Sequence, residues 1–83
     1  MAKQKKKVAV PGKNAGKIAK LGARIKALRI KQGYASAEKF ALDHELSRVQ
    51  MGRWEQGKNI RVETVFKLAD AFGITASELI RDI

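Results

Sequence analysis

The residues of this chain with the clearest chemical potential lie in one short stretch, Ser47 to Glu55, which reads Ser-Arg-Val-Gln-Met-Gly-Arg-Trp-Glu. With about 3.6 residues per turn, a helix here places Met51 and Trp54 on one side. The other faces then carry Arg48, Val49, Gly52 and Arg53. So short a helix, apolar behind and basic in front, is not stable alone. Its apolar side must pack against the rest of a folded domain, and its basic side suits an anionic binding partner. The stretch therefore indicates non-covalent binding of an anionic molecule.

Catalytic and metal-binding residue sets are missing from the rest of the sequence. The chain has no cysteine and a single histidine, His44. A lone histidine lacks the companion ligands of a zinc site, and the acidic residues are scattered along the chain. No Ser/His or Cys/His combination suggests an activated nucleophile. We therefore expect no enzyme activity, no metal, no cofactor and no small-molecule ligand.

The charge of the chain favours a polyanionic partner. Its 83 residues include 18 Lys and Arg against 8 Asp and Glu, a net charge of +10, and seven lysines precede Leu21 without a single acid. A lysine run can be a solvated tail, or it can bind a polyanion. A membrane-surface helix would interleave bulky apolar residues with the lysines, which this run does not. Nucleic acid is therefore favoured over a membrane.

The composition also indicates where the protein is located and how many domains it has. No apolar run is long enough to span a bilayer, and the basic N-terminus lacks the apolar core of a secretory signal. The absence of cysteine gives no indication of an oxidising compartment. We expect one cytoplasmic domain, near the lower size limit for folding without disulfides or metals.

The pattern of apolar residues and helix breakers predicts an all-α domain, residues 15–83, behind a flexible basic arm, residues 1–14. The first helix is expected from about Ala15 to Gln32, and the second from Ser36 to Asp43 or His44. The third begins at Ser47, where Ser47 and Gln50 can form a capping box, and it ends at Gly57.

Two further helices are expected after a polar loop. The fourth runs from about Val62 to Phe72 and stops at Gly73. Its apolar pattern is Val62, Val65, Phe66, Leu68, Ala69 and Phe72. The fifth opens with a capping box between Thr75 and Glu78. No segment shows the alternating pattern of a strand.

Only Glu45 and Leu46 separate the second helix from the third, which predicts two helices that cross steeply about a short turn. This arrangement resembles the lambda-repressor-like, Cro-type helix-turn-helix (XRE) family, which implies a compact five-helix fold that binds DNA. The resemblance runs from about Leu21 to Ile80. It rests on Leu28-Arg29, Glu38-Lys39-Phe40-Ala41, Leu46-Ser47-Arg48, Arg53-Trp54-Glu55-Gln56-Gly57 and Leu68-Ala69-Asp70-Ala71-Phe72-Gly73-Ile74.

The sequence departs from the family pattern around the turn. Ala37 stands where the family usually has a phosphate-binding glutamine, and Glu45 stands where it has the turn glycine. His44 replaces the preceding apolar residue. A non-glycine residue at positive φ costs on the order of 1 kcal/mol, so a lengthened or reshaped turn is one expectation.

The resemblance implies that Arg48, Val49, Gly52 and Arg53 line the DNA-facing side of a recognition helix. Arginine can donate two hydrogen bonds to guanine, valine can contact a thymine methyl group, and glycine allows close backbone approach. The alternative is that both arginines are ordinary solvated residues. The resemblance also pairs Arg29 with Glu55 as an internal ion pair, while Met51 and Trp54 belong to the core.

Phosphate contacts are expected around this helix and in the arm. Such contacts position a protein on DNA without reading the bases. The candidates are Ser36, Gln50, Gln56, Lys58, Asn59 and Arg61, with Gln50 shared between this role and its cap. Some family members carry a lysine-bearing arm that wraps around the duplex, which implies the same role for Lys3, Lys5, Lys6 and Lys7.

These features together predict a sequence-specific, double-stranded DNA-binding regulator of bacterial or phage type, in its simplest form a repressor that occupies an operator. The resemblance suggests a homodimer through the last helix, with Ile80 and Ile83 at the contact, although both could instead pack inward. One alternative is the antitoxin of a toxin–antitoxin pair, which binds a partner through the fourth or fifth helix. Another is a protein-interaction module whose basic arm is incidental.

Overall fold

The structure, a computed structural model, describes residues 11–83, with side chains described from Gly16 onward. It contains five helices: α1 (Pro11–Lys31), α2 (Ala37–Asp43), α3 (Arg48–Glu55), α4 (Val62–Phe72) and α5 (Ala76–Leu79). The described part of the chain contains no strand, so the predicted all-α, five-helix class is confirmed. None of these described helices is long and apolar enough to cross a membrane.

The helix α1 begins earlier than the sequence pattern predicted. The helix begins at Pro11, so residues 11–14, which were expected in the arm, are helical. Proline suits the first helical position because it has no N–H to leave unpaired and its φ is already close to the helical value. The first helix was expected from about Ala15, so α1 is four residues longer at its start, while the division into a flexible arm and a domain stays a prediction. Residues 1–10, with the arm lysines, lie outside the described residues.

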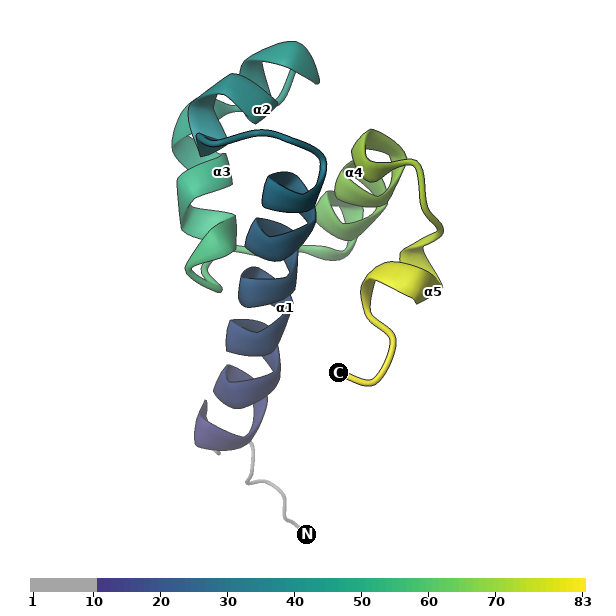
Figure 1. Cartoon of the computed structure of the whole chain (residues 1–83). Helices are drawn as coiled ribbons and strands as arrows, with labels where there is room; N and C mark the ends of the chain where they lie inside the picture. The colour runs from purple at the N-terminus through teal and green to yellow at the C-terminus, as the bar shows by residue number, and fades with distance from the viewer. Residues whose placement is uncertain (1–10) are drawn as a thin grey trace, which may run out of the picture.

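The long helix α1 is the axis of the domain. Figure 1 shows α2 and α3 on one side of α1 and α4 and α5 on the other, with the first turns of α1 extending beyond its neighbours. The buried residues come from every helix, and Phe40 of α2 stacks on Phe72 of α4 at a ring distance of 5.0 Å. The core consists of Leu21, Ile25, Phe40, Ala41, Met51, Trp54, Leu68, Ala69, Phe72 and Leu79.

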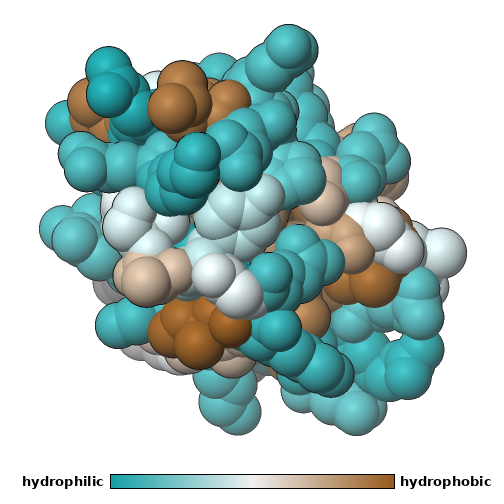
Figure 2. Space-filling view, turned by 45° about the horizontal axis from the view of Figure 1, so that its top comes forward, coloured by the Kyte–Doolittle hydropathy of each residue, from teal (hydrophilic) through white to brown (hydrophobic). Residues whose placement is uncertain are grey.

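Two residues of the apolar pattern of α4 lie outside this core. Val62 is 71% exposed and Phe66 is 57% exposed. They are four residues apart and share one side of α4, while Leu68 and Phe72 face inward from another side. Figure 2 shows that the apolar groups on one face of the molecule form small patches with hydrophilic side chains between them. The apolar pattern therefore predicts the helix but not which of its apolar residues the other helices cover.

A close backbone contact between α1 and the end of α3 fixes the position of α3. A Cβ atom on Gly22 would lie 2.6 Å from the Gly57 nitrogen and 2.8 Å from the carbonyl oxygens of Glu55 and Trp54. Only glycine fits at such a distance. Gly57 itself has φ +77°, a left-handed conformation that glycine adopts without strain. The two glycines thus let the helices meet backbone to backbone.

Gly22→Ala is expected to destabilise the domain by about 1–3 kcal/mol, because the added methyl group overpacks this contact. Gly16→Ala in the same helix is the matched control, since a Cβ there meets nothing within 4 Å. That change should instead stabilise the domain by about 0.5–1 kcal/mol through helix propensity. Urea unfolding measures both. A Gly22→Ala protein as stable as the wild type would contradict the close contact.

Candidate nucleic-acid interface

The recognition segment α3 is held at both ends and along its back. At its start, the Ser47 hydroxyl accepts a hydrogen bond from the Gln50 amide at 3.2 Å. At its end, the Lys58 amide donates to the Arg53 carbonyl at 2.9 Å. Met51 is fully buried and Trp54 is 7% exposed. So short a helix keeps its shape because the core holds its apolar side.

The outward side of α3 carries the four residues assigned to base contacts. Arg48, Val49 and Arg53 are exposed, and Gly52 is half-buried. A Cβ atom on Gly52 would meet nothing within 4 Å, so the packing of this domain does not require glycine at that position. The result is an open strip with two guanidinium groups, one exposed valine and a stretch of bare backbone.

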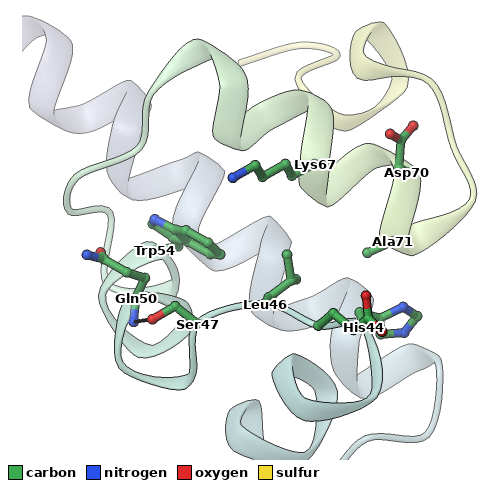
Figure 3. A pocket seen from close by; sticks show the side chains of 9 residues that line it. His44, Leu46, Ser47, Gln50, Trp54, Lys67, Asp70 and Ala71 are labelled. Carbon is green, nitrogen blue, oxygen red and sulfur yellow. Dashed lines mark hydrogen bonds between the residues drawn. The ribbon is translucent and has the colours of Figure 1, made fainter.

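Gln50 does not complete the predicted capping box. Its amide is bound by Ser47, but no hydrogen bond returns from its side chain to the Ser47 amide among the described residues. Its Oε1 atom is instead buried without a partner, which is costly for a polar atom. Gln50 and Lys67 are among the residues that line a hollow of about 560 Å³ between the turn and α4. Figure 3 shows their side chains reaching it from α3 and from α4. The Gln50 carboxamide therefore takes no part in the cap, and its Oε1 atom is covered by the domain.

The predicted phosphate-contact residues flank α3 on both sides. Gln56, Lys58, Asn59 and Arg61 are exposed in the loop that leads to α4. Arg61 occupies the N-cap position of α4 without a side-chain cap, and a second hollow, of about 340 Å³, adjoins it. On the other side, the exposed Ser36 caps α2 by accepting from the Lys39 amide at 2.9 Å. Its hydroxyl proton remains available to an acceptor.

The turn between α2 and α3 keeps its left-handed residue although that residue is glutamate. Glu45 has φ +57°, and the Leu46 amide donates to the Ala41 carbonyl at 2.8 Å. This hydrogen bond is the usual closure of a helix that ends in a left-handed residue. The turn is therefore neither lengthened nor rebuilt, and Glu45 adopts a strained conformation within it.

Glu45→Gly is expected to raise the free energy of unfolding by about 1 kcal/mol, because glycine adopts positive φ without the steric cost that a Cβ imposes. For a domain of this size the melting temperature should rise by about 4–8 °C. Asn59→Gly is the matched control, since Asn59 also has positive φ, +56°, but asparagine tolerates it. Equal gains from the two changes would contradict strain specific to Glu45.

Aromatic and polar contacts brace α2 against the preceding loop. The His44 ring lies 4.3 Å from the Phe40 ring, and Tyr34 stands edge-on to Phe40 at 5.1 Å. The Tyr34 hydroxyl donates to the Asp43 carboxylate at 2.9 Å. That bond lowers the pKa of Asp43, with Lys39 assisting, and it raises the pKa of Tyr34. The stabilisation from ionised Asp43 is thus present above its ordinary pKa and is lost as the pH falls through the lowered value.

Arg29 and Glu55 lie in direct contact and link α1 to the last residue of α3. The Arg29 Nε atom is 2.7 Å from Glu55 Oε2, and Nη2 is 3.2 Å from Oε1. The remaining nitrogen, Nη1, donates to the Tyr34 carbonyl at 2.7 Å. The side chains are only 5% and 10% exposed. A two-pronged, nearly buried pair of this kind fixes orientation as well as distance.

The sequence-based reasoning did not single out two side chains near the site. Arg24 donates to the carbonyl oxygens of Leu79 and Arg81 and so fastens the end of α5 to α1. Lys67 lines both hollows beside α3. The partners of Arg24 are backbone atoms 55 and 57 residues away, which leave no trace in the residue pattern. In the sequence, nothing distinguishes Lys67 from any other exposed lysine on a helix.

A comparison with protein families identifies the domain. The model of the Helix-turn-helix family, of the Cro/C1 (XRE) type, matches residues 25–79. The match includes α2, α3, α4 and α5 and begins within α1. Neither the curated proteins nor the solved structures contain a match to the chain. The family match covers more than half of the chain and all of the candidate interface from Ser36 to Arg61. The chain is therefore a member of the Cro/C1-type helix-turn-helix family of DNA-binding regulators.

Proposed function

We propose that this chain is a sequence-specific repressor of bacterial or phage type, which acts by occupying an operator in double-stranded DNA. The observation that carries the proposal is the exposed strip of Arg48, Val49, Gly52 and Arg53 on a helix anchored by Met51 and Trp54. In this proposal α3 enters the major groove. Its arginines donate to guanine, and Val49 contacts a thymine methyl group.

Phosphate contacts on either side of α3 would fix its register. Ser36 stands at the start of α2, and the loop before α4 supplies further polar side chains. The proposed set is Ser36, Gln50, Gln56, Lys58, Asn59 and Arg61. The open amides at the start of α4 suit the same role, because a helix N-terminus attracts anions. The arm lysines Lys3, Lys5, Lys6 and Lys7 would add phosphate contacts that depend on salt.

We propose that a homodimer would form through the residues at the end of α5 and directly after it. Ile80 is 46% exposed, whereas Ile83 packs against the core and has less apolar surface to offer a second copy. A two-fold contact would therefore centre on Ile80. Two half-sites roughly 34 Å apart would match such a dimer. Sedimentation of the wild-type chain and of Ile80→Asp tests this, because only the wild type should form a dimer. A monomer at high concentration and on its operator would rule the dimer out.

An antitoxin remains the second candidate, for a specific reason. Val62 and Phe66 present an exposed apolar pair on α4, a surface that a toxin could cover. An antitoxin would repress its own gene through the same α3. Co-expression with the product of the adjoining gene separates the two functions. A stable complex lost in Phe66→Asp would favour the antitoxin, and a neighbour that does not bind would favour the simple repressor.

The direct experiment on the proposed function is selection of binding sites from random duplexes, followed by gel shifts at several salt concentrations. A repressor should enrich one sequence, with two-fold symmetry if it dimerises. Binding without enrichment would mean that DNA is bound but not read. A chain that shifts no duplex even at low salt would instead be a protein-interaction module.

Gly52→Ala should separate DNA recognition from stability. The added methyl group meets nothing inside the domain, so helix propensity should stabilise the fold by about 0.5–1 kcal/mol. If the backbone at Gly52 lies against the bases, the same methyl group should weaken operator binding by about 1–3 kcal/mol, the range for one lost base contact. Thermal unfolding and anisotropy titrations measure the two effects. A more stable protein with unchanged affinity would place Gly52 away from the DNA.

A further inference from the structure

A row of positive charges lies on α1, outside the interface described above. Lys17, Lys20, Arg24 and Lys31 follow one another at intervals of three, four and seven residues, which places them on one side of a helix. We call these four residues the lysine stripe. Lys17, Lys20 and Lys31 are exposed, and Arg24 is half-buried. With about 1.5 Å per residue, the stripe is roughly 21 Å long.

The lysine stripe is turned away from α3. Gly22 faces the end of α3, whereas Arg24, two residues later, donates to the carbonyls of Leu79 and Arg81 on the other side. Two residues correspond to about 200° around a helix. Figure 1 shows the same arrangement, with α3 and the C-terminus on opposite sides of α1. A straight duplex bound by α3 therefore does not reach the stripe.

The charge of the stripe is not neutralised within the described residues. The ion pairs found there join Arg29 to Glu55 and Lys39 to Asp43, so neither includes a member of the stripe. The sequence of α1 contains no acidic residue, in its first turn or beyond. An external polyanion would neutralise this charge.

Duplex DNA fits this surface better than a membrane does. A membrane-surface helix needs bulky apolar side chains beside its lysines. Most of the exposed residues next to the stripe are small, namely Gly16, Ala23 and Ala27, and the bulky exception is Ile30, which is 53% exposed. Contacts from lysines to phosphates require no base sequence, and a duplex offers a charge about every 1.7 Å along its axis. Several of these charges fall within the length of the stripe.

We propose that the lysine stripe is a second, sequence-independent binding surface for duplex DNA, so that one chain holds two DNA segments on opposite sides of α1. The first segment is the duplex bound by α3, so this inference rests on the proposed function. Bridging of this kind would let an operator-bound chain capture a neighbouring stretch of DNA. It would depend strongly on salt, because each phosphate contact contributes roughly 0.9 to the salt slope.

Energy transfer between two 20-base-pair duplexes, one labelled with a donor and the other with an acceptor, tests the bridge with the full chain. Lys17→Gln/Lys20→Gln removes two charges from the stripe, and Lys26→Gln/Lys39→Gln removes two exposed charges elsewhere. The wild type and the second variant should bring the duplexes together. The first variant should lose the transfer, because two of the phosphate contacts of the stripe are gone. Anisotropy of one labelled duplex should show that all three proteins still bind DNA.

The other outcomes are separable. If the wild type binds a duplex but produces no transfer, the bridge is wrong and the proposed function survives. If it binds no duplex at all, both fail together. Transfer that persists in Lys17→Gln/Lys20→Gln would assign bridging to the arm or to a dimer and would overturn the stripe. Binding to phosphatidylserine vesicles that depends on Lys17 and Lys20, without bridging, would assign the stripe to membranes instead.

Discussion

Glu55→Ala should lower the free energy of unfolding by about 3–5 kcal/mol, because it leaves the Arg29 guanidinium buried without its counter-charge. Small domains are stable by only about 5–15 kcal/mol, so the loss is a large fraction of the total. The two hydrogen bonds of 2.7 and 3.2 Å and the low exposure of both side chains place this pair among the nearly buried ones. Thermal and urea unfolding would measure the effect.

A double-mutant cycle then isolates the interaction itself. Arg29→Ala also removes the hydrogen bond to the Tyr34 carbonyl, so its cost alone is not the cost of the pair. If the pair is real, the double variant should be more stable than the sum of the single losses predicts. Lys39→Ala is the control, since the Lys39–Asp43 pair is exposed and such pairs contribute little. Additive losses from Arg29→Ala and Glu55→Ala would contradict the pairing.

Helix ends with strong local chemistry were predictable from the sequence. Thr75 and Glu78 form the complete capping box expected of them, with the Thr75 amide donating to Glu78 at 2.8 Å. Gly73 ends α4 at φ +72°, as its position predicted. These signals act between residues three or four apart, so the sequence itself contains both partners. The same holds for Ser36 and Ser47 as helix caps.

Features that depend on distant partners were not predictable in this way. Whether Phe66 is buried or exposed depends on how much of the α4 surface the other helices cover. The spacing of apolar residues along α4 does not contain this information. The turn at Glu45 shows a different limit. Its strain is tolerated because the rest of the fold holds α2 and α3 in place, and this support is not visible in the two residues of the turn.

In the candidate interface, too, local features were predictable from the sequence and contacts between elements were not. The amphipathic pattern of α3 predicted which residues face outward, because Met51 and Trp54 fix its buried side. It could not predict that the Gln50 side chain stays out of the cap, since the spacing of Ser47 and Gln50 is the same with or without a complete capping box. Nor did it reveal that Gly22 and Gly57 set the distance between α1 and α3. Each of these depends on geometry between elements.

Arg48→Ala/Arg53→Ala should abolish sequence recognition while leaving the fold intact. Each arginine that reads a base pair contributes about 1–3 kcal/mol to the cognate site, so the double variant should lose roughly 2–6 kcal/mol of binding free energy. Both side chains are exposed and lie in no ion pair among the described residues, so the melting temperature should hardly change. Titration of the selected operator and of a scrambled duplex at fixed salt would measure affinity and preference together.

The contrast with phosphate contacts makes this prediction specific. Lys58→Ala/Arg61→Ala removes the same number of charges from the adjoining loop, where no base is expected within reach. That variant should weaken binding to both duplexes by similar factors and reduce the magnitude of the salt slope by roughly 1.8. It should keep the preference for the operator. If Arg48→Ala/Arg53→Ala behaves in the same way, with preference unchanged, the arginines act only as charges and another part of the chain reads the sequence.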